Sequence, residues 1–464
     1  MSKLHDAEIV SYKTNFLTRI KKVKFQIVNF LYGFKFIYKS FGCKDFIYPN
    51  NILNSHEKRY VDKLSKNVNS KEKLLHLKFK EIKVGDYIYD DYLRTHNQIT
   101  VNVNSSEFRD YLKKTLCLCF FWYKKLDPKI YKALIISHSS YLMGLIGKIA
   151  VYKDIPTYRV SLSSSFRLSK KYPRDFLDFK NYPKLIKKIN PSIKNKFQKN
   201  IEKNITEYFL KKRINLDKYK KNFINEKLNV LISAHCFTDA VHYHGVKNCF
   251  IDFYEWLNFI GKLSNKLNYN WFIKLHPSDY EKNLDFINLF LKRYPRLILL
   301  DKDTKNFDLI KKIDAVLTVY GSVGREFTLF NIPVINASTC GPHCGYNFNY
   351  NIDNKKNYLH VIKNLKFYIK KFKFKKKEIF DFFFLRFFLD YSFFYNAKYI
   401  FNINEDLRTK RIDFEDIIEI WSKIINKKVN SNIERNVLKF IKSKNYRFIS
   451  DNSKKFSEHI DIKI

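Results

Sequence analysis

The segment 319–326 holds two of the chain's 11 glycines, Gly321 and Gly324. An apolar run at 315–319 precedes them, and a helical pattern and a second apolar run at 333–335 follow. Strand, glycine turn, helix and strand in this order predict a βαβ unit. Its turn leaves backbone N–H groups at a helix start, where an anion such as phosphate binds. The alternative is a plain strand-to-helix turn, because one glycine-rich turn is a weak signal.

A histidine and a proline end a second apolar strand. The run 271–275 leads into His276, Pro277 and Ser278, and ligands of open α/β sheets bind outside the carboxyl ends of the strands. Because proline stiffens the turn, we expect His276 to point into that crevice. An imidazole there can donate to a phosphate oxygen or, as imidazolium, stabilise a departing phosphate. A histidine that caps the strand or the next helix is the alternative.

A third polar loop follows the apolar strand expected at 228–232. It carries His235 and Asp239, and His242 and His244 come soon after them. Packing does not require such a cluster, so the sequence predicts a binding loop. Metal binding is an alternative, although phosphate or acceptor recognition agrees better with the other features of this half.

Two segments of the first half carry groups that could act as a general base. A short strand and turn are expected over 83–90. The segment 85–94 brings three carboxylates, Asp86, Asp90 and Asp91, and Arg94 into one short turn. His138 stands at the end of an expected strand, before a helix. For any single carboxylate, a solvated turn or a helix cap is the alternative role.

The composition indicates a large folded protein with excess positive charge. Of 464 residues, 45% are apolar and 17% aromatic, which argues against extensive disorder. The 87 basic and 45 acidic side chains give a formal net charge of +42, which attracts nucleic acid, anionic lipid or phosphorylated substrates.

Seven scattered cysteines indicate a reducing cytoplasm. A zinc site at Cys340, His343 and Cys344 lacks a fourth ligand.

The order of strands and helices predicts an α/β fold with two Rossmann-like domains facing a cleft, flanked by basic helical extensions. A single core does not grow to 464 residues. We expect a basic helical extension at 1–79, one Rossmann-like domain at 80–225 and a second at 226–345. A helical appendage at 346–464 would pack across both domains.

Both ends of the chain combine basic and apolar residues. The spacing over 12–40 predicts an amphipathic helix that docks on its own domain or lies on an anionic membrane. The stretch 368–395 mixes lysines with phenylalanines, so a membrane-facing patch is the alternative to packing there. Residues 412–425 form another expected helix, and the polar tail after Asn430 is expected to be frayed. The most apolar window, 133–151, is too interrupted to span a bilayer, and no secretory signal is visible.

Five segments together resemble the GT-B glycosyltransferases of bacterial polysaccharide biosynthesis, particularly those of the capsule and O-antigen type. They are GDYIYDDYLR at 85–94, SHSSYLMGLIGKIAVYKDIPTY at 137–158, SAHCFTD at 233–239, FIKLHPS at 272–278 and YGSVGREFTLFNIPVI at 320–335. They occur in the family's order. The His-Pro turn is also similar to that of CMP-sugar transferases of the sialic-acid and Kdo type.

The resemblance implies an acceptor on the domain at 80–225 and a sugar nucleotide on the domain at 226–345. It implies phosphate binding by His276, Ser278, Gly321 and Ser322, and hydroxyl binding by Glu326. The full implied donor site is His235, Asp239, Lys274, His276, Pro277, Ser278, Tyr320, Gly321, Ser322 and Glu326. The implied catalytic residues are Asp90, the leading base candidate, with His138 and His276.

We therefore expect a metal-independent glycosyltransferase with no cofactor beyond its nucleotide-sugar co-substrate, for which a CMP-linked donor is one candidate. Its acceptor would be a growing surface polysaccharide, such as capsule or lipopolysaccharide, or a lipid-linked glycan. We expect it in the cytoplasm, with peripheral contact to the inner membrane as an option.

A polyol-phosphate transferase of the CDP-glycerol type shares the architecture and is an alternative. A nucleic-acid-binding protein is another, although the lysines are spread along the chain and no nucleic-acid motif occurs. An inactive scaffold with this fold is the last alternative.

Overall fold

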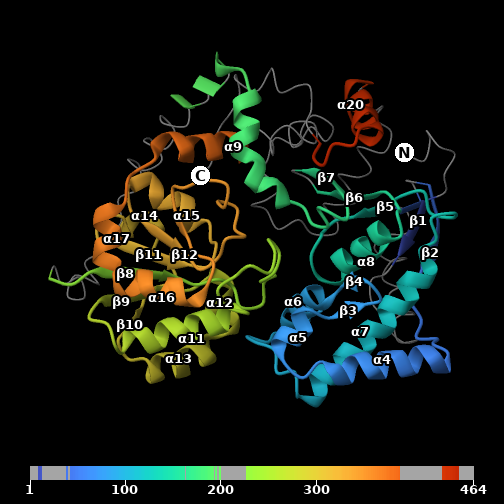
Figure 1. The fold of residues 1–464 in the computed structure, drawn as a ribbon, viewed down its shortest axis with the longest axis horizontal. Helices are drawn as coiled ribbons and strands as arrows, with labels where there is room; N and C mark the ends of the chain where they lie inside the picture. The colour runs from blue at the N-terminus through green and yellow to red at the C-terminus, as the bar shows by residue number, and fades with distance from the viewer. Residues whose placement is uncertain are drawn as a thin grey trace. The chain divides into compact units, whose positions relative to one another are not determined.

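The computed structural model describes residues 9–12, 38–39, 42–161, 164–192, 194–195, 198–199, 226–386 and 431–448. The chain divides into two compact units (Figure 1). Unit 1 takes in the described residues of Met1–Ile88, Val103–Asp175 and Phe388–Phe456, and unit 2 those of Tyr89–Asn102, Phe176–Phe387 and Ser457–Ile464. The four sequence domains stay a prediction. The helices expected at 12–40 and 412–425 lie outside the described residues, except that Tyr12 ends strand β1 and that 38–39 are described.

Unit 2 contains a six-stranded sheet in which every neighbouring pair of strands is parallel. The strands are β8 (Asn229–Ser233), β9 (Asn270–Lys274), β10 (Leu297–Leu299), β11 (Ala315–Thr318), β12 (Val334–Asn336) and β13 (Tyr350–Asn351). Their spatial order is β10-β9-β8-β11-β12-β13. Counted along the chain, this is the 3-2-1-4-5-6 order of a doubly wound Rossmann sheet. The α/β class and the parallel sheet predicted from the sequence are thus confirmed.

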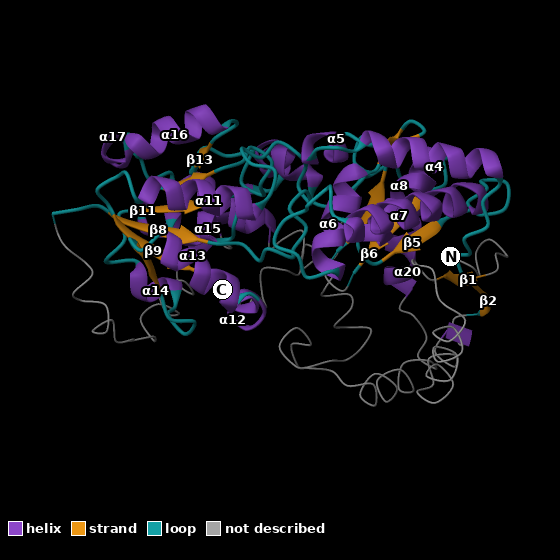
Figure 2. Ribbon diagram, turned by 90° about the horizontal axis from the view of Figure 1, so that it is seen from below, coloured by secondary structure: helices purple, strands orange, loops and turns teal. Residues whose placement is uncertain are grey.

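The sheet of unit 2 is apolar on both faces because helices cover both of them (Figure 2). Leu231, Phe272 and Val316, on three neighbouring strands, are fully buried in one cluster with Leu309 and Phe327. Burying each such side chain contributes about 1.5–3 kcal/mol to folding.

The helices of unit 2 lie before, between and after the strands of its sheet. The α-helices are α9 (Tyr182–Leu185), α11 (Phe253–Ser264), α12 (Pro277–Lys282), α13 (Leu284–Arg293), α14 (Asn306–Leu309), α15 (Val323–Glu326), α16 (Lys355–Lys363) and α17 (Leu365–Lys371). Three short 3-10 helices are η1 (Leu177–Asn181), η2 (Ile186–Lys188) and η4 (Thr328–Phe330). Part of the phenylalanine-rich stretch is core, since Phe382 is buried against Phe179 and Tyr182.

Unit 1 is more irregular. Its strands are β1 (Ile9–Tyr12), β2 (Cys43–Ile47), β3 (Lys78–Phe79), β4 (Ile82–Lys83), β5 (Leu134–Ile136), β6 (Thr157–Val160) and β7 (Ser165–Leu168). Its helices are α4 (Ser55–Asn67), α5 (Lys71–Leu75), α7 (Ser106–Lys125), α8 (Tyr141–Tyr152) and α20 (Ser431–Lys442). In its three-stranded sheet β5 and β6 are parallel and β7 is antiparallel. A second Rossmann-like domain therefore stays a prediction.

Two local expectations were wrong. The segment 85–94 is not a strand and turn but most of helix α6 (Gly85–Thr95), which contributes residues to both units. Its apolar residues recur at helical spacing, and Tyr87, Ile88 and Leu93 are fully buried. The polar tail also contains order, because Phe440 on α20 packs against Tyr158 on β6.

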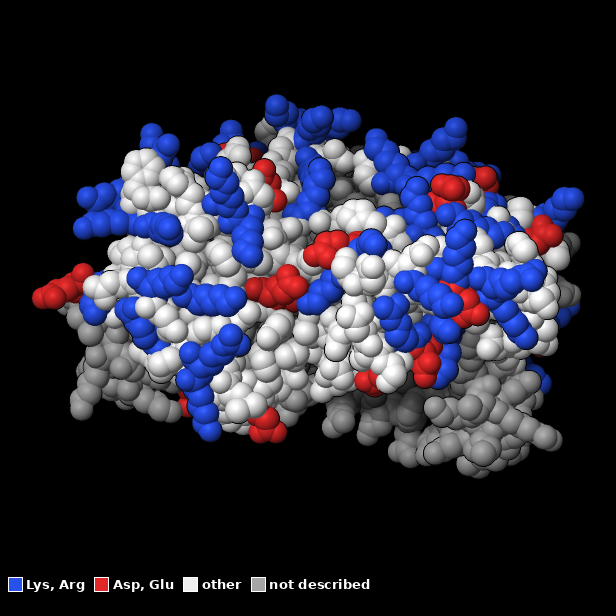
Figure 3. All heavy atoms as spheres, turned by 60° about the horizontal axis from the view of Figure 1, so that its bottom comes forward, with Lys and Arg blue, Asp and Glu red and all other residues white. Residues whose placement is uncertain are grey.

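Charge is spread widely over the surface. Figure 3 shows Lys and Arg side chains scattered across the visible face, with fewer Asp and Glu between them. Within the described residues, no helix combines the length and the apolar character needed to cross a bilayer.

Candidate functional site

The strand order of unit 2 defines where a ligand would bind. The chain winds away from β8 in one direction through β9 and β10, and in the other through β11 and β12. In doubly wound sheets the ligand lies outside the carboxyl ends of the strands at this switch point, here between β8 and β11. His235 follows β8, and Tyr320, Gly321 and Ser322 follow β11.

His235 joins the two loops at the switch point. Its Nε2 accepts hydrogen bonds from the Tyr320 backbone N–H at 3.3 Å and from the Thr318 hydroxyl at 3.1 Å. Two donors to Nε2 place the ring proton on Nδ1. The ring stacks on Phe253, with centroids 4.3 Å apart and planes within 8°. Burial lowers the pKa of His235 to about 4, against the opposing charge of Asp239, so the ring is neutral near pH 7.

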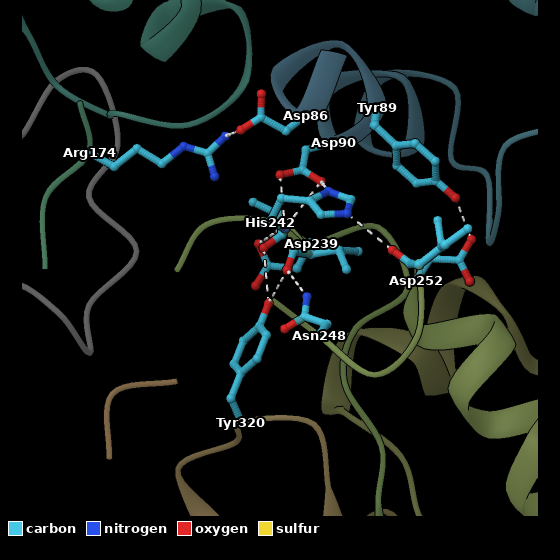
Figure 4. Close-up of polar contacts among 12 residues, drawn as sticks. Asp86, Tyr89, Asp90, Arg174, Asp239, His242, Asn248, Asp252 and Tyr320 are labelled. Carbon is cyan, nitrogen blue, oxygen red and sulfur yellow. Dashed lines mark hydrogen bonds and ion pairs between the residues drawn. The ribbon is translucent and has the colours of Figure 1, made fainter. Parts of the chain in front are cut away.

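Tyr320 contacts the loop after β8 through its side chain as well as through its backbone N–H. Its hydroxyl donates to the carbonyl oxygens of Val241 at 2.8 Å and Ala240 at 3.2 Å, and the Asn248 amide also donates to Val241 (Figure 4). Asp239 begins this stretch as an exposed residue, and its carboxylate accepts the Ala240 N–H at 2.8 Å. The predicted residues His235, Asp239 and Tyr320 are therefore brought together.

Gly321 and Ser322 form the entry to α15. The Gly321 N–H donates to the Thr318 hydroxyl at 3.4 Å, which orients the turn. Ser322 is exposed at the N-cap position, and no side chain caps the helix. An uncapped, exposed helix start can receive an anionic group.

His276 is exposed and serves as the N-cap of α12. Its Nδ1 accepts the Ser278 N–H at 3.3 Å, and Pro277 occupies the first turn of the helix. The capping role, which sequence reasoning kept as the alternative, is thus present. It does not exclude ligand binding, because a neutral ring that accepts at Nδ1 carries its proton on Nε2.

Lys274 and Glu326 are linked by a residue that the sequence did not single out. The Lys274 ammonium donates to Oδ1 of Asn306 at 2.7 Å, and the Asn306 amide donates to Oε2 of Glu326 at 2.6 Å. Burial lowers the pKa of Lys274, while Glu326 and Asp308 act in the opposite direction. These two hydrogen bonds connect the end of β9 with the start of α14 and with α15.

Asp90 lies in unit 2 and is fully buried, not exposed as a free base would be. Its carboxylate accepts from His242 Nδ1 at 2.7 Å and from the His242 backbone N–H at 3.1 Å. The other ring nitrogen of His242 faces the Ile251 carbonyl oxygen at 3.1 Å (Figure 4). Asp90 thus fixes the loop that follows β8.

Asp252 is a second buried carboxylate that sequence reasoning missed. Its carboxylate accepts hydrogen bonds from the hydroxyl groups of Tyr89 and Thr100, each at 2.5 Å. It also caps α11 by accepting the Glu255 N–H at 2.8 Å. Burial, assisted by Asp252, raises the pKa of Tyr89 well above its usual value. An aspartate directly before an amphipathic run is an N-cap signal, so the cap was detectable from sequence, but the partners were not.

The remaining base candidates lie in unit 1 or are buried. His138 is exposed beside the Ser137 hydroxyl, 2.9 Å from its Nδ1. Asp86 forms a buried ion pair with Arg174 at 2.8 Å (Figure 4). The Arg174 guanidinium also lies over the Tyr87 ring. Burial lowers the pKa of nearby Lys148 to about 8.

A search of the described residues finds no group of three or more His, Cys, Asp or Glu side chains that could hold a metal ion. At the suggested zinc site, burial raises the pKa of Cys344 to about 11 and lowers that of His343 well below its usual value. Neither ring nitrogen of His343 has a hydrogen-bond partner among the described residues.

No protein-family model matches the sequence, and no curated protein matches it. Three solved structures are similar at a low level. KpsC, beta Kdo 2,4 transferase, from Thermosulfurimonas dismutans is 12% identical with a TM-score of 0.36, over 55% of this chain and 80% of its own. KpsC, beta Kdo 2,7 transferase, from the same organism is 17% identical with a TM-score of 0.31, over 50% and 69%. UDP-GlcNAc 2-epimerase from Neisseria meningitidis bound to UDP-GlcNAc is 12% identical with a TM-score of 0.28, over 57% and 77%. Each likeness covers only part of this chain.

Proposed function

We propose that this protein is a glycosyltransferase that moves a sugar from a nucleotide-sugar donor to a surface polysaccharide or a lipid-linked glycan. The observation that carries the proposal is the junction where His235 binds both Thr318 and Tyr320. This junction fixes the two loops at the switch point of a doubly wound sheet, where such folds bind nucleotides. The reaction type comes from the five segments that resemble GT-B transferases.

The donor phosphate is assigned to the entry of α15 and to His276. Both Ser322 and His276 are exposed, so a ligand can reach them. The turn into α15 would present backbone N–H groups, and the Nε2–H of His276 would provide one more donor. When the bond between the sugar and the phosphate breaks, the electron pair passes to the phosphate oxygen. These donors would stabilise the charge that develops there.

Glu326 is assigned to the hydroxyl groups of the ribose or the sugar. Asn306 binds its Oε2, which orients the carboxylate and leaves Oε1 as the acceptor for a ligand hydroxyl. Lys274 fixes the Asn306 amide from the other side at 2.7 Å.

The acceptor hydroxyl must lose its proton as its oxygen attacks the anomeric carbon. Asp90 stays the predicted base, but its contacts with His242 favour a positioning role. His138, which is exposed, is the other candidate.

Nucleotide binding tests the donor site. Isothermal titration of the whole chain with CMP, CDP, UDP and GDP should give saturable binding of one base over the others. His276→Ala should weaken that binding about tenfold, whereas His360→Ala, an exposed histidine on α16, should not change it. Absence of binding by all four nucleotides would refute the donor site.

Transfer activity tests the reaction. With the sugar form of the preferred nucleotide, His276→Ala and Glu326→Ala should each remove most turnover while the melting temperature stays near the wild-type value. Turnover of CDP-glycerol with no sugar transfer would instead establish the polyol-phosphate alternative.

A further inference from the structure

Residues 355–377 form a continuous basic segment on unit 2. They include ten lysines and neither an acidic residue nor an arginine. The lysines are Lys355, Lys356, Lys363, Lys366, Lys370, Lys371, Lys373, Lys375, Lys376 and Lys377. All are exposed except Lys375, which is partly exposed and pairs with Glu378 at 3.6 Å. We name residues 355–377 the α16–α17 platform.

The α16–α17 platform is anchored to the core of unit 2 by its inner side. Tyr358 and Ile362 of α16 are fully buried, and the Trp256 indole N–H donates to the Tyr358 hydroxyl at 3.0 Å. The Tyr350 hydroxyl donates to the Tyr368 carbonyl oxygen at 2.9 Å, which attaches α17 next to the edge strand β13. The lysines are therefore held on the outer side of a fixed support.

Two phenylalanines are exposed among these lysines. Phe367 is 58% exposed and Phe374 is 37% exposed, whereas most large apolar residues in the described part of the chain are buried. The Lys371 ammonium lies 5.6 Å from the centroid of the Phe367 ring. Exposed aromatic rings beside clustered cations can insert at the level of lipid headgroups while the cations remain near the phosphates.

We propose that the α16–α17 platform binds the surface of an anionic lipid bilayer. Clustered lysines are attracted to the negative surface of such a membrane, and the exposed phenylalanines add apolar contact. Nucleic acid is the competing polyanion. The platform has no arginine, the side chain that most often forms bidentate contacts with phosphates and bases. The lipid surface therefore fits better.

Vesicle binding tests this proposal with the full chain. Wild-type protein should co-sediment with vesicles of phosphatidylcholine and phosphatidylglycerol, about 7:3, at least tenfold more than with phosphatidylcholine alone. The binding should weaken as salt rises. The triple variant Lys366→Glu/Lys370→Glu/Lys373→Glu should lose about tenfold or more of it. Phe367→Ser/Phe374→Ser should lose several-fold, with most of the remaining binding removed by salt.

A matched control separates the platform from general charge. The variant Lys262→Glu/Lys266→Glu/Lys292→Glu makes the same charge change at exposed positions of α11, of the turn that follows it and of α13. It should bind vesicles almost as well as wild type, and circular dichroism should show that both triple variants are folded. Equal losses in the two triple variants would overturn the proposal. So would platform-dependent binding of a poly(U) strand without binding to anionic vesicles. Because nucleotide titration does not involve this surface, its result stands apart from this test.

Discussion

Asp90 and His242, which are 152 positions apart in sequence, form a buried hydrogen bond of 2.7 Å. The same histidine faces the Ile251 carbonyl oxygen with its second ring nitrogen, so one side chain ties α6, the loop after β8 and the approach to α11. Both ring nitrogens therefore have an oxygen partner, so the ring is held from two sides.

Removing Asp90 should therefore destabilise unit 2. Asp90→Ala leaves the ring and the backbone N–H of His242 buried without their carboxylate. A buried polar group that loses its hydrogen-bond partner costs about 1–3 kcal/mol. Urea unfolding followed by circular dichroism measures the loss. The exposed Asp303→Ala is the control and should stay within about 0.5 kcal/mol of wild type. If Asp90→Ala is as stable as the control but inactive, Asp90 is a catalytic base rather than a positioning residue.

The neutral state of His235 should make stability depend on pH. Its pKa falls from 6.5 to about 4 on folding, so the unfolded chain takes up a proton that the folded chain does not. The stabilisation is complete above pH 6.5 and declines as the pH falls to about 4, by at most about 3 kcal/mol. Unfolding free energies of wild type and His235→Gln, measured between pH 7.5 and 4.5, should diverge in slope within that window. Parallel curves would contradict the assignment.

Gly324 should not tolerate a side chain. A Cβ there would lie 2.7 Å from Nδ2 of Asn349 and 2.8 Å from Nδ1 of His343. Overpacking of this kind costs about 1–3 kcal/mol, so Gly324→Ala should lower the melting temperature by several degrees. In a His343→Ala background the same substitution should cost less, because one of the clashing groups is gone. An unchanged cost in both backgrounds would show that this clash is not its origin.

Asn306 should matter for donor affinity although we expect no contact between it and the donor. Asn306→Ala releases both Lys274 and Glu326, and we expect the affinity for the preferred nucleotide-sugar to fall about fivefold to tenfold by titration. The exposed Asn268→Ala is the control. Affinity that survives in Asn306→Ala but is lost in Glu326→Ala would show that Glu326 does not need this support.

The sequence predicts the strands of unit 2 well because each is a short apolar run that ends in polar residues. The expected runs 228–232, 271–275 and 315–319 differ from β8, β9 and β11 by at most one residue at each end. Parallel strands buried on both faces require such runs. The strand order places the ends of β8 and β11 next to each other, and this explains why His235 lies beside Tyr320.

The parts that sequence could not predict depend on contacts between distant segments. The carboxylates of 85–94 were expected in a turn, whereas their helix buries Asp90 against His242. Tyr87, Ile88 and Tyr89 are consecutive residues of types that favour strands. Only the spacing of the apolar residues over the longer stretch to Leu93 indicates a helix. Asn306 had no distinguishing neighbour, since its role depends on Lys274 and Glu326, 32 and 20 positions away.

The strand order also has a consequence for biosynthesis. β8 is flanked by β9 and β11, so one edge of it stays open until Thr318 has been translated. At about 5–20 residues per second, that wait lasts on the order of 4–17 s after Ser233. During this time an apolar strand edge is available to ribosome-associated chaperones or to neighbouring nascent chains. Ribosome-bound chains stalled before β11 should therefore be cut rapidly near β8 by added protease, and chains stalled well beyond β12 should resist.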